Sequence, residues 1–288
     1  MDGSMKIMAV VCHPADAVDH AGGTLCLHSQ KGDAVTVVVC THGVDSHDYR
    51  RSESLKKRRA GVADRKAAIR KKEAEVRQGL AILGVTDVRF LRLADDYVSV
   101  TRELVEAIAT ELADVQPHLL LLHNPTEELG FAHTDTAVAA LKAIGIANKP
   151  RFVKKPRSRS FPAQVFFVTM YGHTNQLVSE GMRHGDVLVD ITSVVDRKVQ
   201  AMDCLDSQYY RGDLARKCIE ITNGRMGLHW CVPYAESFQT LYPGVYSHLP
   251  ANDYLLHHAA APISEELKRL KIMVHQVPVH RGDAQDAE

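Results

Sequence analysis

Apolar positions in the first 150 residues fall into short runs that alternate with longer amphipathic segments. Strands are predicted over Lys6–Val11, Ala34–Thr41, Val88–Leu93 and His118–His123. Helices are predicted over Asp19–Gln30, Arg102–Val115 and Thr134–Ile146, and a long helical region between the second and third strands is predicted to end in Glu75–Leu83. The strand runs are almost continuously aliphatic, which is typical of a parallel sheet buried on both faces. The alternation predicts an α/β fold with a Rossmann-like, mostly parallel sheet and helices on both faces.

The second half of the chain is less regular. After a basic linker at 151–159, strands are predicted over Gln164–Met170 and Val187–Ile191, and one helix over Thr192–Tyr210. A short amphipathic helix is predicted over Ile263–Val274. We expect a single α/β domain over residues 5–250, followed by a C-terminal extension over 251–288 that carries this helix and a frayed tail.

Composition narrows the class of partner. The chain has 35 Lys and Arg against 35 Asp and Glu, so its net charge does not favour nucleic acid or a membrane surface. Its longest apolar runs are too short to cross a bilayer. Six cysteines without paired spacing predict reduced thiols in the cytoplasm. The segment 50–72 holds 11 Lys or Arg against two acids, which predicts a solvated helix face or flap, with anion recruitment or subunit contact as alternatives.

The turn after the first predicted strand carries candidate metal ligands. His13-Pro14-Ala15-Asp16 follows Val11-Cys12, so its side chains would lie at the carboxyl end of a strand, where open α/β sheets hold their ligands. An imidazole and a carboxylate on one turn suit zinc or another divalent metal, and catalytic zinc usually takes a third protein ligand. His133, in the loop after the fourth strand, would reach the same edge if the two strands are neighbours. In the simpler alternative, Asp16 caps the following helix and His13 packs on it.

Several motifs together resemble the LmbE-like, or GlcNAc-phosphatidylinositol de-N-acetylase, superfamily over about residues 6–245. They are His13-Pro14-Ala15-Asp16, Gly22-Gly23-Thr24, Ile82-Leu83-Gly84, the His133 loop, and the segment from Asp190-Ile191-Thr192-Ser193 through Gln208. The resemblance implies an LmbE-like fold and one Zn²⁺ per chain, bound by His13, Asp16 and a third ligand. Matching the helix after the loop makes His133 that ligand, whereas another register places Thr136 there.

Two departures from the family pattern bear on the reaction. The family opens with His-Pro-Asp-Asp, and its first Asp is the general base of the deacetylases, but Ala15 occupies that position here. The acid expected after the second strand is missing or displaced to Asp45. The 4-oxalomesaconate hydratase branch is similar to this chain in its His-x-Ala-Asp turn, in the helix beginning Asp190-Ile191-Thr192-Ser193, and in Tyr234-Ala235-Glu236. That branch adds water to a conjugated double bond of a dicarboxylic keto acid.

Proton transfer at such a site needs a further side chain. His173, after a predicted strand, is the first candidate because an imidazole exchanges protons near neutral pH and the hydratase branch is similar there. The other candidates are Asp45, His47 and Glu236. Substrate carboxylates could be bound by His47 or clamped by an arginine, and the arginine candidates are Arg50, Arg51 and Arg225.

Other polar residues near the turn are expected to be structural. Alternation along the strand predicts that Cys12 points away from His13 into the core. His42 and His123, both at strand ends, are expected to hydrogen-bond to the metal ligands or to lie in the core rather than to bind the metal themselves. Lys198 is expected to fix the helix that carries it.

These observations predict a zinc-dependent enzyme that uses a metal-bound water on a small polar, anionic substrate. Hydration or elimination is favoured over deacetylation because Ala15 removes the expected base. The alternatives are an N-deacetylase acting on an N-acetylated sugar or related amide, and a catalytically degenerate binding or assembly subunit. We expect a cytoplasmic homo-oligomer whose partner is a small molecule, with no nucleic-acid or membrane partner.

Overall fold

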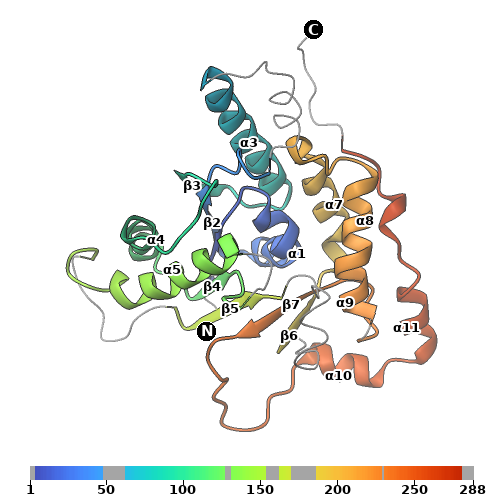
Figure 1. The fold of residues 1–288 in the computed structure, drawn as a ribbon. Helices are drawn as coiled ribbons and strands as arrows, with labels where there is room; N and C mark the ends of the chain where they lie inside the picture. The colour runs from blue at the N-terminus through green and yellow to red at the C-terminus, as the bar shows by residue number, and fades with distance from the viewer. Residues whose placement is uncertain are drawn as a thin grey trace.

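The computed structural model describes residues 4–47, 62–126, 131–153, 162–169, 186–228 and 230–280, and within these ranges seven strands form one sheet (Figure 1). The strands are β1 (Lys6–Val11), β2 (Ala34–Thr41), β3 (Asp87–Leu93), β4 (Leu119–Leu122), β5 (Gln164–Val168), β6 (Val187–Asp190) and β7 (Ala235–Thr240). Their order is β3-β2-β1-β4-β5-β7-β6. Neighbouring strands from β3 to β5 are parallel, whereas β7 is antiparallel to β5 and β6. The predicted mostly parallel α/β sheet is confirmed.

Helices cover both faces of the sheet. One face carries α1 (Asp16–Gln30), α3 (Val62–Ile82), α7 (Val195–Asp203) and α8 (Asp213–Ile219), and the other carries α4 (Arg102–Val115) and α5 (Phe131–Ala147) (Figure 1). Because successive strand residues point to opposite faces, Ile7, Ala9 and Val11 of β1 join the core under α1. Met8 and Val10 join the core under α4 and α5.

Helix α1 packs closely against other parts of the chain at a pair of glycines. A Cβ on Gly23 would lie 2.6 Å from Cγ2 of Ile191, the residue after β6. A Cβ on Gly22 would lie 3.2 Å from Cδ1 of Leu83. A Cβ atom is essentially never found as close as 2.6 Å to another heavy atom. Because Gly23 has no Cβ, α1 can lie directly on the end of β6.

Several predicted boundaries are wrong. The single helix expected over Thr192–Tyr210 is a 3₁₀ turn (Thr192–Val194), α7, and a second 3₁₀ turn (Asp206–Gln208). The chain turns there because buried Asp203 accepts hydrogen bonds from Gly212 N at 2.8 Å and Arg216 Nη1 at 2.9 Å. Strand β7 was not expected, and neither were α8 nor the helical turns after it.

The C-terminal region contributes both exposed and buried residues. A π-helical turn (Glu220–Gly224) and α9 (Arg225–Leu228) precede β7, and α10 (Asp253–Ala260) and α11 (Ile263–Arg269) follow it. Helices α10 and α11 have no buried residue, and α11 ends before the predicted Val274. Beyond α11, Val274 in a last 3₁₀ turn (Val274–Gln276) and Val277 are buried in the α1-side core. Among the helices in the described ranges, none has the length and apolar character needed to span a bilayer.

Candidate metal centre

Three side chains converge where the sheet carries the ends of β1 and β4. These strands are parallel neighbours, so the turn after β1 and the segment after β4 meet at the same edge. His13 lies in the first of these, Asp16 is the first residue of α1, and His133 lies in the first turn of α5. The expectation that His13 and His133 share an edge is confirmed, although His133 lies inside the helix rather than before it. Asp16 Oδ2 accepts a hydrogen bond from His13 N at 2.7 Å, which closes the turn.

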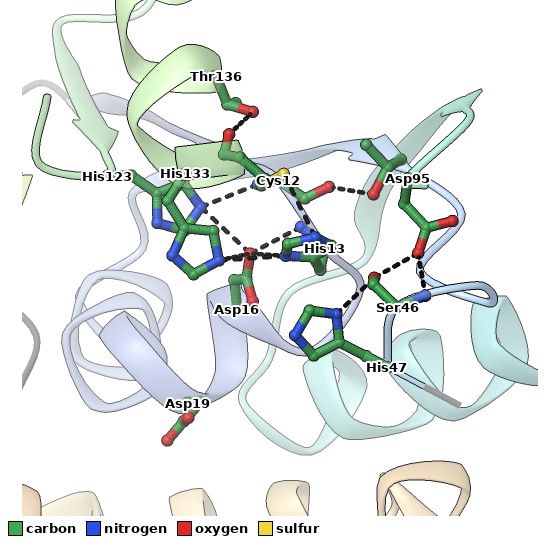
Figure 2. Close-up of polar contacts among 12 residues, drawn as sticks. Cys12, His13, Asp16, Asp19, Ser46, His47, Asp95, His123, His133 and Thr136 are labelled. Atoms are coloured by element: carbon green, nitrogen blue, oxygen red, sulfur yellow. Dashed lines mark hydrogen bonds and ion pairs between the residues drawn. The ribbon is translucent and has the colours of Figure 1, made fainter. Parts of the chain in front are cut away.

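The potential ligand atoms lie close enough to bind one ion. His13 Nδ1 is 3.1 Å from His133 Nε2 and 3.4 Å from Asp16 Oδ2, and His133 Nε2 is 3.5 Å from Asp16 Oδ2 (Figure 2). His13 and Asp16 are buried and His133 is half-buried. The three residues therefore form a compact group that could hold a metal ion.

Thr136, the ligand in the alternative register, is not part of this group. Its side chain is fully buried, and its Oγ1 donates to Ala132 O at 2.8 Å within α5. The structure therefore places His133, and not Thr136, beside His13 and Asp16.

His123 is closer to the cluster than the sequence suggested. Its Nε2 lies 3.2 Å from Asp16 Oδ2 and accepts a hydrogen bond from Cys12 N at 2.9 Å. Its ring stacks on that of His133, with centroids 4.0 Å apart and planes at 7° (Figure 2). The residue follows β4 directly, so the stacking partner of His133 comes from a rigid strand end.

The prediction that Cys12 points away from His13 is wrong. Cys12 is fully buried as expected, but its Sγ lies 3.6 Å from His13 Nε2. Strand alternation does not apply because β1 ends at Val11, one residue earlier.

Burial and charge set the protonation of the cluster. Burial alone would raise the pKa of Asp16, but the neighbouring His133 and His13 and the contact with His123 hold this pKa well below its usual value. His20 lies on α1, and the centroid of its ring is 5.3 Å from that of His123. Burial lowers the pKa of His20 well below its usual range. Burial, helped by His13, lowers the pKa of His47 to about 4. The pocket thus holds an ionised carboxylate among imidazoles, of which His20 and His47 are neutral at neutral pH.

The segment after β2 reaches the same place. The His47 ring lies beside that of His13, with centroids 4.2 Å apart. Behind it, Asp95 accepts hydrogen bonds from Ser46 and lies 2.7 Å from His42 Nδ1. Burial would raise the pKa of Asp95, but its bonds to His42 and Ser46 lower it far below its usual value.

Asp45, a predicted catalytic residue, points into a different set of contacts. Asp45, His42 and Asp95 form a second group with metal-ligand chemistry. Arg65 Nη2 donates to Asp45 Oδ2 and lies 3.1 Å from His42 Nε2. A guanidinium therefore already supplies the positive charge of this group.

Glu236 is held in a buried ion pair. Its Oε1 lies 2.8 Å from Lys198 Nζ, and both side chains are fully buried. Its two carboxylate oxygens also accept from Gly23 N at 2.8 Å and Thr24 N at 2.7 Å. Lys198 Nζ donates further to Asp19 O and Asn223 Oδ1. These contacts attach α7 and β7 to α1 and occupy both oxygens of Glu236 with structural partners.

The remaining predicted site residues fall elsewhere. Arg225 is exposed at the start of α9. His173, Arg50 and Arg51 lie outside the described residues, as does part of the basic segment 50–72.

Comparison with known proteins agrees with this architecture. Residues 8–144 match the GlcNAc-PI de-N-acetylase (PIG-L) family. The chain is 27% identical over 253 residues to a 4-oxalmesaconate hydratase of Pseudomonas putida KT2440, covering 84% of this chain and 91% of that protein. It superposes on GalB, the 4-carboxy-2-hydroxymuconate hydratase of Pseudomonas putida KT2440, with a TM-score of 0.70 and 24% identity, covering 85% of this chain and 100% of that one. It superposes on the N,N'-diacetylchitobiose deacetylase of Pyrococcus horikoshii with a TM-score of 0.63 and 20% identity, covering 88% and 89% of the two chains.

Proposed function

Because the chain carries a PIG-L/LmbE family domain, we propose that it is a zinc-dependent hydro-lyase that adds water to, or removes it from, a small anionic substrate. The metal ligands in this proposal are His13, Asp16 and His133. The observation that carries the proposal is that these three donors are brought together while the neighbouring position holds Ala15, which has no carboxylate.

The donor set fits zinc in both chemistry and spacing. Two imidazole nitrogens and one carboxylate oxygen are the donors that catalytic zinc takes, with a further position left open. Metal–ligand distances of about 2.0–2.1 Å place the ligand atoms of a tetrahedral site roughly 3.3 Å apart. The separations here are 3.1, 3.4 and 3.5 Å. An ion bound there would lower the pKa of a coordinated water or polarise a substrate oxygen.

The residue at position 15 favours hydration. A deacetylase needs a general base to activate water for attack on an amide, and the methyl group of buried Ala15 cannot accept a proton. Hydration of a conjugated double bond needs an acid and a base of moderate strength, which an imidazole supplies in both directions. The similarity of the chain to a hydratase over 84% of its length supports the same choice.

A second candidate function is N-deacetylation. Its support is the family match over residues 8–144, since that family is described by a de-N-acetylase activity. In this case another side chain must replace the missing carboxylate at position 15, and His173 and Asp45 remain the candidates.

The metal site is tested by the zinc content of the purified protein. We expect close to one zinc per chain, measured by elemental analysis, and loss of zinc in Asp16→Ala and His133→Ala because each removes a donor. Thr136→Ala is the matched control from the same helix, and it should keep the metal. Zinc retained in His133→Ala and lost in Thr136→Ala would overturn the ligand assignment.

The reaction is tested with two probes on the zinc-loaded protein. Consumption of 4-oxalmesaconate with uptake of water supports the hydro-lyase, and release of acetate from N,N'-diacetylchitobiose supports the deacetylase. If neither reaction occurs, the binding or assembly role becomes the better account. We also keep the expectation of a cytoplasmic homo-oligomer. Its support is that the cysteines are free thiols, four of the six of them buried, and that α10 and α11 expose apolar side chains.

A further inference from the structure

A chain of hydrogen bonds leads from a buried carboxylate to an imidazole beside the metal-ligand group. Asp95 accepts from the backbone N of Ser46 at 2.8 Å and from its hydroxyl. Ser46 Oγ in turn lies 2.6 Å from His47 Nδ1. Figure 2 shows Asp95, Ser46 and His47 in line, with the His47 ring next to His13.

The ionised carboxylate at one end of this chain determines where its protons lie. An ionised carboxylate only accepts, so the Ser46 hydroxyl donates its single proton to Asp95. The Ser46 oxygen is then an acceptor toward His47, whose Nδ1 must carry the proton. A neutral imidazole has one N–H, so His47 Nε2 is left unprotonated.

We propose that His47 is a catalytic residue that takes over proton transfer from the carboxylate that Ala15 lacks, with Ser46 and Asp95 as positioning residues. This inference rests on the proposed hydro-lyase function. The arrangement follows the logic of catalytic triads, in which an acceptor behind Nδ1–H fixes the tautomer of the ring and stabilises the positive charge that forms on it. Here the serine hydroxyl lies between the ring and the carboxylate.

The proton balance of the reaction is simple. His47 Nε2 accepts a proton from water while the water oxygen forms a bond to one carbon of the substrate double bond. The imidazolium then returns that proton to the adjacent carbon, so one water is added across the bond and the ring ends as it began. The reverse sequence removes water. Throughout, Nδ1–H stays bonded to Ser46, and Asp95 faces the transient positive charge through the hydroxyl.

The hydrogen-bond chain is tested without a substrate by NMR of the histidine rings. In protein labelled with ¹⁵N-histidine, long-range ¹H–¹⁵N correlations report the tautomer, and His47→Gln identifies the His47 signals. We expect the Nδ1–H tautomer in the unmodified protein. In Ser46→Ala it should be replaced mainly by Nε2–H, while Ser46→Thr should keep it because threonine retains the hydroxyl.

The chain offers a matched control for this substitution. Ser247 Oγ lies 2.9 Å from Nδ1 of the adjacent His248 on the exposed surface. Ser247→Ala therefore removes the same local contact at a distant site, and it should leave the His47 tautomer, the zinc content and the reaction rate unchanged.

The catalytic role is tested by the kinetics of 4-oxalmesaconate hydration. A general acid–base residue contributes about 10²–10⁴-fold to the rate. We therefore expect His47→Gln to lower kcat by at least about 100-fold, with KM and zinc content nearly unchanged. Ser46→Ala should lower kcat by less, and Ser46→Thr should recover most of the loss. A purely structural role would lower zinc content or protein yield together with activity.

The outcomes separate this inference from the function on which it rests. A protein that binds zinc and hydrates the probe, but keeps its kcat in His47→Gln, would retain the proposed function and overturn the role of His47. A protein with neither zinc nor activity overturns both. An Nε2–H tautomer of His47 in the unmodified protein overturns the hydrogen-bond chain directly.

Discussion

Lys198 and Glu236 form a fully buried ion pair, and their other hydrogen bonds end on α1 except the one from Lys198 to Asn223. Removal of one partner from a buried pair leaves a charge without compensation, which costs about 3–5 kcal/mol. Because these contacts attach β7 and α7 to the helix that begins with Asp16, the pair also holds the metal-ligand turn in place.

We expect Glu236→Gln to lower the free energy of unfolding by about 3 kcal/mol, because the Lys198 ammonium then lacks its counter-charge. Urea-induced unfolding followed by circular dichroism measures the change. The control is Glu106→Gln, which neutralises the partly exposed partner of the surface residues Arg102 and Arg151 and should change the unfolding midpoint little. Equal effects of the two substitutions would contradict the structural role of the buried pair.

At the same scale, the sequence predicts the three proposed ligands but not the side chains that surround them. His13 and Asp16 could be found because they directly follow an apolar strand, and His133 because it follows another. The position of His47 could not be found in this way, because it depends on a hydrogen bond to Ser46 and on Asp95, which is distant in sequence. Glu236 was interpreted as a catalytic acid because nothing in its local sequence shows that Lys198 faces it.

Among the elements, the buried strands were predicted most accurately. The aliphatic residues of β1, β2 and β4 give an unambiguous pattern, and their parallel pairing follows from the helices between them. Strand β7 reads Ala-Glu-Ser-Phe-Gln-Thr and was missed, because its buried Glu236 and Ser237 interrupt the apolar alternation. The long helix after Thr192 was predicted as continuous because buried Asp203, which receives bonds from Gly212 and Arg216, looks like an ordinary polar helix position.

Gly23 tests the close packing of α1 on the end of β6. We expect Gly23→Ala to destabilise the protein by about 1–3 kcal/mol, since the added methyl group would overlap Ile191. Gly145→Ala in α5 is the matched control, because a Cβ there meets no atom within 4 Å. That substitution should stabilise the protein by up to about 1 kcal/mol through the better helix propensity of alanine. The urea midpoints of both variants measure the difference, and a shift in the same direction for both would contradict the packing.

For the whole molecule, the described part of the C-terminal region is joined to the domain rather than separate from it. Val274 and Val277 are buried in the core that also contains α1, and Arg216 donates to Val277 O at 2.8 and 3.1 Å from Nη2 and Nε. The predicted boundary at residue 250 sets the exposed α10 and α11 apart from the sheet, but Val274 and Val277 lie beyond these helices and pack in the core of the domain. Whether the extension over 251–288 unfolds separately from the domain is tested by the next substitution.

We expect Val274→Ala to lower the free energy of unfolding by about 2 kcal/mol, because it leaves a cavity in the shared core. The protein should still unfold in one cooperative transition, at a lower urea concentration. Val245→Ala, at a side chain that is 93% exposed, is the control and should have little effect. A second transition that moves alone in the Val274 variant would mean that the C-terminal region folds independently.

The attachment of α1 to Lys198 and Glu236 has a consequence for the protein as it is synthesised. All three proposed ligands lie before residue 134, whereas Lys198 and Glu236, which bind the backbone of α1, come 65 and 103 residues after His133. A nascent chain therefore exposes the proposed ligands to the cell before Lys198 and Glu236 can fix the helix that begins with Asp16. This follows because a domain generally folds as a unit once its last elements have been synthesised. The metal first captured would then reflect the ions available around the ribosome, because geometry and supply, more than raw affinity, decide which divalent ion a site takes.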